Sequence, residues 1–422
     1  MRRMIAKGLL LGSVVGVLLL VAVDAEAIPA FARKYKLGCN VCHTVYPQLN
    51  RFGRDFRDNG FRMPDEVQEL LKKKVSPVGS HDPATGGAAA QEGADFWSFI
   101  PEEIPFSIQA KLHGVLNPKG DIKTDFQFEE LQLQGGGTFT SRVSYYLHHH
   151  LAEEGEPGEL YAGWLRFNNL FGSNWLNVTV GQAELPLSFS PEIERLSSFE
   201  YLVFDRELGA NRFNLNRPQL GVQLFGQSDR GTKIWAGVAN GSGLAVNEAT
   251  ETFDNNSFKD VYARVGQEIG EHFIGGYAYL GRSREGSAPG GVSNTFVRVG
   301  ADAFVNLSKV TMSATALYAR DDNPLGTGER RSFTGGFVEA GLHLTERTVV
   351  LLRFDGVRQK LPATLESEEA EEADGPLFRV NTFAFTPGVQ FLVQPNVKLG
   401  FEYQVRQSRR EDRGLVQFHV SF

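Results

Sequence analysis

Several common features are scarce or missing in this chain of 422 residues. Beyond the N-terminus, no apolar run reaches the roughly 18–20 residues that a membrane-spanning helix needs, so the sequence predicts no such helix there. The formal net charge is only −7, and no basic patch with interleaved aromatic residues points to a nucleic-acid partner. The sequence also holds no catalytic triad, phosphate-binding glycine loop or glycosidase-type carboxylate pair. The informative features are therefore its few cysteines and the pattern of its apolar residues.

The chain has only two cysteines, Cys39 and Cys42, and they precede His43 in the motif C-x-x-C-H. This spacing is typical of a covalently attached c-type haem, whose vinyl groups bind the two thiols and whose iron binds the histidine. A zinc half-site would need further cysteine or histidine ligands nearby, and a thioredoxin-type redox pair would need a βαβ context that is missing. The motif therefore predicts one covalent haem c, with His43 as an axial iron ligand.

The first 27 residues have the three parts of a secretory signal peptide. Basic residues come first, the apolar stretch Gly8–Val23 follows, and Ala25 and Ala27 form a small-residue cleavage site. The mature chain is therefore expected to begin near Ile28. A retained N-terminal anchor is the alternative, but sixteen residues are few for a membrane span. Export fits a c-type haem, because bacteria attach this haem after translocation.

Candidates for the second axial ligand are few, because the chain has only four methionines. Met1 and Met4 leave with the signal peptide, whereas Met63 lies twenty residues after His43. A methionine ligand would raise the reduction potential of the haem. His81 is the alternative nearby, and a residue from later in the chain or an open iron position are the remaining alternatives.

The surroundings of the motif indicate a very small helical cytochrome segment over residues 28–75. Pro47 suits the first turn of a helix, and Asn59-Gly60 suits its end. One face of this helix carries three apolar residues that can pack on the haem, namely Leu49, Phe52 and Phe56. A second short helix is expected over residues 65–74. Residues 76–103, which begin with a Gly/Ala/Ser/Pro-rich run, are interpreted as a linker.

Residues 104–422 show the period-two alternation of β-strands. The first such segment alternates apolar residues with polar ones such as Lys111 and His113, and the last ends in Phe422. Segments of about ten residues with apolar side chains outward and polar side chains inward are typical of outer-membrane barrels. A C-terminal phenylalanine is also what the outer-membrane assembly machinery commonly reads. A soluble β-helix or two-sheet stack is the alternative, but it would expose rows of apolar side chains to water.

The alternation predicts sixteen antiparallel strands that close into an all-β barrel, because lipid cannot satisfy an exposed sheet edge. The predicted strands are 104–116, 123–135, 138–151, 158–169, 174–184, 217–227, 231–240, 258–267, 271–282, 292–306, 308–320, 332–345, 346–359, 377–394, 396–408 and 413–422. Short connections, the first at Gly135–Gly137, alternate with long ones, as periplasmic turns alternate with extracellular loops. The long connection from Leu185 to Asn216 can fold into the lumen as a constriction. The haem segment is then expected on the periplasmic side.

Six side chains on the predicted inner face are candidates for contacts with a cation: His113, His148, His150, Asp125, Glu129 and Glu130. Imidazoles near a pore mouth can bind a metal ion transiently, and carboxylates favour hard cations such as Fe(II). A break in the apolar phase predicts a β-bulge at Glu129–Glu130. Six further carboxylates from Glu366 to Asp374 fall in a predicted extracellular loop and would attract cations. Ordinary solvated side chains are the alternative in each case.

Residues 28–61, IPAFARKYKLGCNVCHTVYPQLNRFGRDFRDNGF, followed by a linker and a porin-like barrel, resemble the fused outer-membrane cytochrome–porins of iron-oxidising bacteria. The resemblance rests on the Pro-Ala-Phe-Ala-Arg lead, the C-x-x-C-H motif, a proline four residues after the histidine, and the later Phe-Gly and Asn-Gly pairs. It implies a monohaem conduit in which Cys39, Cys42 and His43 hold the haem and the cytochrome plugs the barrel from the periplasmic side. Such a conduit would accept an electron from extracellular Fe(II) and pass it to a periplasmic cytochrome or another carrier.

The sequence therefore predicts a protein of the outer membrane of a Gram-negative-type bacterium that moves single electrons through one haem. Fe(II) oxidation is the expected activity, with lipid, Fe(II) or another redox-active donor or acceptor, and a periplasmic carrier as partners. Outward electron transfer to extracellular acceptors is the first alternative. A solute porin with a haem-containing plug is the second, and a peroxidase-like or gas-binding haem is the third.

Overall fold

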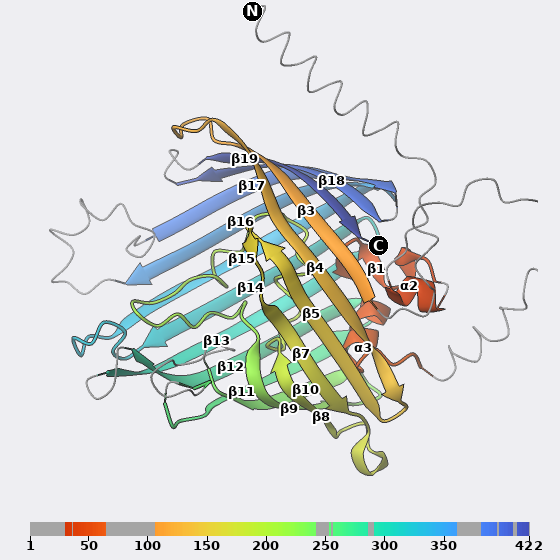
Figure 1. Cartoon of the computed structure of the whole chain (residues 1–422), viewed down its shortest axis with the longest axis vertical. Helices are drawn as coiled ribbons and strands as arrows, with labels where there is room; N and C mark the ends of the chain where they lie inside the picture. Colours follow the sequence, from red (N-terminus) through yellow and green to blue (C-terminus); the bar gives the residue numbers. More distant parts are fainter. Residues whose placement is uncertain are drawn as a thin grey trace, which may run out of the picture.

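The computed structural model describes residues 30–35, 37–64, 106–241, 253–254, 256–285, 291–360, 381–394, 396–407 and 412–421. They form a closed barrel of sixteen long antiparallel strands, with residues 30–64 at one end of it (Figure 1). The predicted fold class is therefore confirmed. No helix in the described ranges is long and apolar enough to cross a membrane. Predictions that fall outside these ranges concern the signal peptide, the 65–74 helix, the linker, His81, the Glu366–Asp374 loop and Phe422.

The barrel strands follow one another in chain order, and the last strand closes the sheet against the first. Their bounds are β3 Phe106–Leu116, β4 Thr124–Thr140, β5 Val143–Glu153, β7 Leu160–Phe167, β8 Asn177–Ala183, β9 Gln219–Gln227, β10 Thr232–Ala239, β11 Asp260–Ile269, β12 His272–Glu285, β13 Val292–Leu307, β14 Val310–Asp321, β15 Arg331–Thr345, β16 Thr348–Lys360, β17 Asn381–Gln394, β18 Val397–Arg406 and β19 Arg413–Ser421. A two-residue strand, β6 Glu156–Pro157, extends the β5–β7 connection. Each predicted strand overlaps one of these sixteen.

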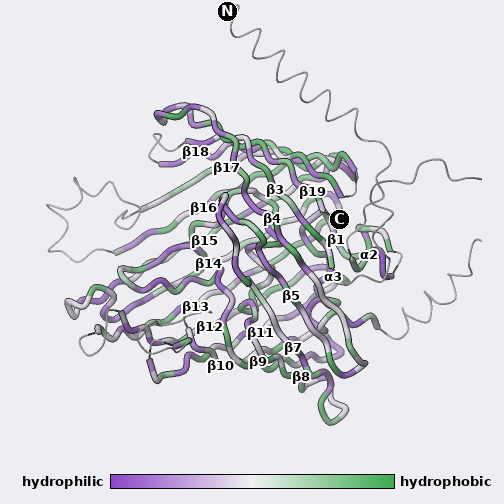
Figure 2. The backbone as a smooth tube through the Cα atoms, in the orientation of Figure 1, coloured by the Kyte–Doolittle hydropathy of each residue, from purple (hydrophilic) through white to green (hydrophobic). Residues whose placement is uncertain are grey.

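The two faces of the sheet differ in the way the alternation predicts. On β16, Leu352 and Phe354 point outward and are 49% and 54% exposed, whereas Arg353 and Asp355 point into the lumen and are fully buried. Figure 2 shows hydrophilic and hydrophobic residues alternating along many of the strands. Successive residues of a strand point to opposite faces of the sheet, so each outward-facing side chain is followed by one that faces the lumen.

One predicted turn is wrong, because Gly135–Gly137 lie inside β4 and the chain reverses at Ser141 and Arg142 instead. The glycines serve another purpose. A Cβ atom on Gly136 would lie 3.1 Å from the ring of Phe61 and 3.2 Å from the ring of Phe31. The missing side chain therefore lets residues 30–64 approach the barrel wall.

The predicted bulge is confirmed. Lys111 of β3 pairs with Glu130 of β4, but the next residue, Leu112, pairs with Phe128, so Glu129 is the extra residue. A bulge of this kind bends the strand and re-aims the side chains around it.

The 184–218 loop between β8 and β9 folds into the lumen, as its predicted role as a constriction requires. Ser198 donates its backbone N–H to Glu402 of β18 at 2.8 Å, and Arg353 of β16 donates to the carbonyl of Glu200 at 2.9 Å. Its apolar residues pack on lumen-facing aromatics, with Leu208 buried near Phe296. We call this segment the inner loop.

The N-terminal segment contains the helices α2 Ala30–Tyr35 and α3 Arg51–Asp58, the 3₁₀ turn η1 Cys39–Val41, and a small ladder of β1 His43–Val45 with β2 Gln48–Leu49. Helix α3 does not begin at Pro47 as predicted. Asn50 caps it instead, because its side chain accepts the backbone N–H of Gly53 at 2.9 Å. The helix ends before Asn59-Gly60 as predicted, and Gly60 has a positive φ of 70°.

Candidate functional site

The residues predicted to bind the haem line one cavity of about 300 Å³ between the N-terminal segment and the barrel wall. Cys39, Cys42 and His43 contribute to one part of its lining, and Met63 contributes as well. Met63 is only 3% exposed, which is consistent with its predicted role as the second axial ligand. We call this space the haem cavity.

One hydrogen bond fixes the tautomer of the His43 ring. Its Nδ1 lies 3.0 Å from the carbonyl oxygen of Pro47, so Nδ1 must carry the proton and Nε2 is left to bind a metal. Burial lowers the pKa of His43, although the hydrogen bond to Pro47 opposes this shift in part. The imidazole is therefore neutral, which is the form that coordinates iron.

The two thiols lie on the tight η1 turn, where Cys42 donates its backbone N–H to the carbonyl of Cys39 at 3.2 Å. The two cysteines do not form a disulfide bond with each other. Burial, helped by the charge of Cys39, raises the pKa of Cys42 to about 11. Helix α3 packs directly on this turn, because a Cβ atom on Gly53 would lie 2.1 Å from the carbonyl oxygen of Cys42.

Aromatic rings from both the segment and the barrel surround the cavity. Phe61 stacks on Phe31 at 5.0 Å, on Tyr146 of β5 at 5.3 Å and on Trp164 of β7 at 6.0 Å between ring centroids. Phe56 is buried and packs edge-on against Phe31 at 5.0 Å. Of the predicted apolar stripe, Leu49 and Phe56 line the cavity, but Phe52 does not. Gly53, the next residue of α3, lines the cavity instead.

The inner loop completes the lining with apolar residues that include Leu185, Leu187 and Ile193. Two thiols at the C-x-x-C-H spacing, an oriented neutral imidazole, a buried thioether and an apolar aromatic enclosure are the groups that a c-type haem requires. The residues present therefore fit this cofactor.

A cluster of charged side chains, most of them buried, ties α3 to the barrel wall, and we call it the clamp. Lys233 of β10 lies 2.8 Å from both Asp55 and Asp58, and Arg54 forms an ion pair of 3.0 Å with Glu268 of β11. Burial alone would raise the pKa of Asp58, but the charges of Lys233 and Arg57 outweigh it and hold that pKa well below its ordinary value. Asp58 therefore stays ionised.

Sequence reasoning missed the clamp, and it noted Gly53 only as part of the Phe-Gly pair, without its packing on the cysteine turn. The repeated Arg-Asp pairs in RFGRDFRD were visible, but their partners lie more than 170 residues away in the chain. No local pattern identifies such partners.

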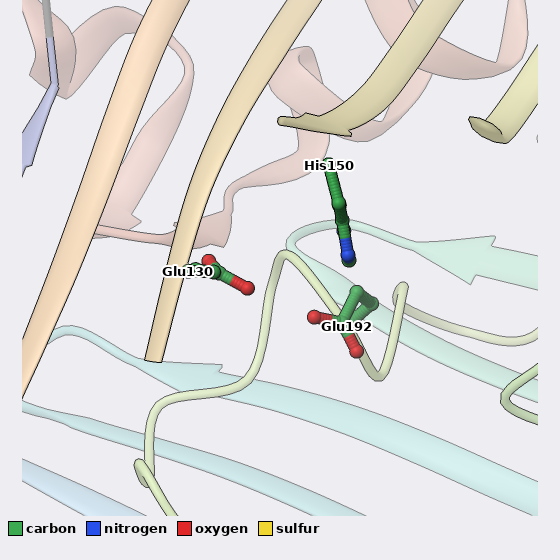
Figure 3. Close-up of side chains that lie close together, drawn as sticks. All are labelled: Glu130, His150 and Glu192. Carbon is green, nitrogen blue, oxygen red and sulfur yellow. The ribbon is translucent and has the colours of Figure 1, made fainter. Parts of the chain in front are cut away.

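The structure does not bring the six candidate cation-binding side chains together at one site. Nδ1 of His113 lies 3.1 Å from the carboxylate of Glu129, and Asp125 lies exposed near the start of β4, where Gln127 donates to it at 3.0 Å. Glu130 and His150, by contrast, come together with Glu192 of the inner loop (Figure 3).

The ring of His148 lies 4.8 Å from that of His150, and His148 is fully buried. Glu192 was not predicted, because its only signal was its place in a long connection.

Comparison with known proteins identifies the fold but no family. No protein-family model matches the chain, and no curated protein matches it. The solved structure of Salmonella typhi OmpF in complex with daunomycin has a TM-score of 0.52 and 11% identity, covering 75% of this chain and 97% of that chain. The outer membrane channel DcaP of Acinetobacter baumannii has a TM-score of 0.51 and 13% identity, covering 75% of this chain and 96% of that chain. At these identities the similarity establishes a porin-like barrel and nothing further.

Proposed function

We propose that this protein is an outer-membrane electron conduit that carries one c-type haem inside a porin-like barrel. The observation that carries the proposal is the C-x-x-C-H motif, whose two thiols and oriented imidazole line a cavity inside the barrel end together with Met63. A haem-binding motif and a barrel are thus parts of one packed unit, as an electron path through a membrane would require.

Two observations support placement in the outer membrane. The outward face carries exposed apolar residues on almost every strand, and such a surface is stable in lipid but not in water. The barrel fold is also that of DcaP, an outer membrane channel. Because short turns surround the N-terminal segment, we assign this end to the periplasm and the long-loop end to the exterior.

Haem c, when bound, supplies reversible one-electron oxidation and reduction. The chain's own residues set its place and access. Cys39 and Cys42 would tether it, His43 Nε2 and Met63 would bind its iron, and the aromatic enclosure would limit water. The clamp would keep α3, and with it the motif, fixed against the wall.

We propose Fe(II) at the exterior as the electron donor and a periplasmic carrier as the acceptor. The resemblance of residues 28–61 to the cytochrome–porins of iron-oxidising bacteria supports this direction. A thioether ligand from Met63 would favour it too, because methionine ligation raises the reduction potential.

The test is a stopped-flow experiment with purified, oxidised protein in detergent, mixed with anaerobic Fe(II). The wild-type haem absorbance is expected to change to the reduced form at once. The double variant Cys39→Ser, Cys42→Ser is expected to lack covalent haem and to consume no Fe(II) with an added artificial acceptor. Asn40→Ser, an exposed change between the two cysteines, is the control and should behave as wild type. Fe(II) consumption by the haem-free variant at the wild-type rate would contradict the proposal.

A solute porin whose lumen holds a haem plug is the second candidate, because the barrel shares its fold with channels. Ion conductance in a planar bilayer separates the two. The conduit predicts low conductance that does not change with the redox state of the haem, whereas a gated porin predicts conductance that does.

A further inference from the structure

A second site lies beyond the haem cavity, where two strands of the wall meet the inner loop. Glu130 of β4, His150 of β5 and Glu192 of the inner loop are all buried, and their candidate ligand atoms lie within 4.8 Å of one another. Figure 3 shows the His150 ring pointing toward Glu192, with Glu130 beside them. The three residues come from separate elements, so the folded barrel and loop are both needed to assemble them.

The His150 ring is prepared for a metal ion rather than for a hydrogen bond. Its Nδ1 lies 3.1 Å from the carboxylate of Glu153, which fixes the proton on that nitrogen. Its Nε2 is buried and has no hydrogen-bond partner among the described residues. A carboxylate that orients a metal-binding histidine in this way is the usual arrangement around protein metal ions.

His148 provides an independent sign that the site is built for a ligand. It is fully buried beside His150, and both of its ring nitrogens lack a partner within the described part of the chain. A buried polar group without a partner costs free energy, so it calls for an explanation such as an ion.

The charges around the site limit what it can bind. Lys111 contacts Glu130, and Arg195 lies 3.9 Å from Glu192, so cationic side chains balance part of the negative charge. A bound cation must therefore compete with Lys111 for Glu130. Two carboxylates and an imidazole together suit first-row transition metals better than Ca²⁺ or Mg²⁺, which prefer oxygen ligands alone.

We propose that Glu130, His150 and Glu192 form a binding site for one divalent transition-metal cation in the lumen. The site shares the inner loop with the haem cavity, because Ile193, the neighbour of Glu192, lines that cavity. Aromatic and imidazole rings also connect the two places. The ring centroid of His150 lies 4.8 Å from that of His148. The His148 centroid in turn lies 6.4 Å from that of Tyr146 at the cavity wall. We take Fe(II) to be the natural occupant, and only this choice of metal rests on the proposed function.

The test is Zn²⁺ binding to the purified, tag-free, haem-loaded chain, measured by equilibrium dialysis and metal analysis. Zn²⁺ is chosen because it undergoes no redox reaction with the haem, so the result does not depend on electron transfer. Wild type is expected to bind one equivalent of Zn²⁺. His150→Gln and Glu192→Gln are each expected to lower the affinity for Zn²⁺ by at least about tenfold, since each change removes a ligand. His149→Gln and Glu156→Gln, at neighbouring positions outside the site, are the matched controls and should bind as wild type.

Equal Zn²⁺ binding by the site variants and the controls would overturn the proposal, as would no binding by wild type. Heat-dependent migration on gels verifies that each variant forms a folded barrel. Lys111→Met supplies a change in the opposite direction, because it removes the ammonium group that competes for Glu130, and it is expected to tighten binding. Unchanged binding by this variant would exclude Glu130 as a ligand. If Zn²⁺ binds as expected but Fe(II) never reduces the haem, the site stands and the proposed function fails.

Discussion

The two parts of the lumen are filled in different ways, although the same sixteen strands surround both. At the short-turn end, rings such as Tyr146 and Trp164 and the side-chain-free Gly136 face the N-terminal segment. Toward the long loops, the wall faces the inner loop instead: Phe213 of this loop packs 4.8 Å from the lumen-facing ring of Phe296, and an ion pair of 2.6 Å joins Arg298 and Asp321 on neighbouring strands. Polar residues are the rule on the inner face of a barrel. Where glycines and aromatic rings replace them, the wall has a docked apolar partner.

The same comparison explains how the segment is held. Apolar packing surrounds the haem cavity, whereas specific charge contacts around Lys233 and Glu268 fix the orientation of α3. Packing and charge therefore have separate roles, and variants can separate them.

The largest effect is expected from Gly53→Ala. The added Cβ would lie 2.1 Å from the carbonyl oxygen of Cys42, so either helix α3 or the cysteine turn must move. We expect loss of most of the covalent haem, measured by haem absorbance per chain after denaturation. Gly276→Ala on β12 is the matched control, because its nearest neighbour would be at an ordinary 3.6 Å. Full haem content in Gly53→Ala would show that the turn and the helix are not in close contact.

The next effect concerns the clamp. Lys233→Met removes the ammonium group from the buried Glu268 and from the partly exposed Asp55 and Asp58. Removing one partner of a fully buried ion pair costs roughly 3–5 kcal/mol, and solvent at Asp55 and Asp58 lowers the cost here. We expect the segment to detach at a lower urea concentration, monitored by the haem absorbance. Lys309→Met, an exposed change at the same end of the barrel, is the control. If both variants detach at the same concentration, packing alone holds the segment.

Met63→Leu tests the apolar half of the comparison. Leucine fills a similar volume but removes the thioether, so the segment should stay docked while the reduction potential falls. Potentiometric titration measures the change. Met312→Leu, on the outward face of β14, should leave the potential as it is. An unchanged potential in Met63→Leu would exclude Met63 as the axial ligand.

The smallest effect is a dependence on pH. The pKa of Asp58 is lower in the docked state than its ordinary value of about 3.9. Its contribution to docking is therefore complete above that value and is lost as the pH falls below it. Urea midpoints measured between about pH 3 and 7 should fall on the acid side, and Asp58→Asn should flatten this fall. An equally steep fall in the variant would assign the effect to other carboxylates.

Prediction from the sequence succeeded where the signal is local. Alternation located all sixteen strands, and one phase break located the bulge at Glu129. It failed where a contact joins distant parts of the chain. Gly135–Gly137 look like a turn until Phe61 is seen against them, and no nearby residue connects Glu192 with His150. Such contacts depend on how a loop and a segment pack inside the finished barrel.

The central claim is that electrons cross the barrel through the haem segment, and liposomes test it most directly. Protein is reconstituted so that the long loops face outward, with an electron-accepting cytochrome trapped inside and Fe(II) added outside. We predict reduction of the trapped cytochrome by wild type and none by the Cys39→Ser, Cys42→Ser variant. Equal reduction with the haem-free variant would mean that Fe(II) itself passes through the barrel, which would contradict the conduit and favour a porin.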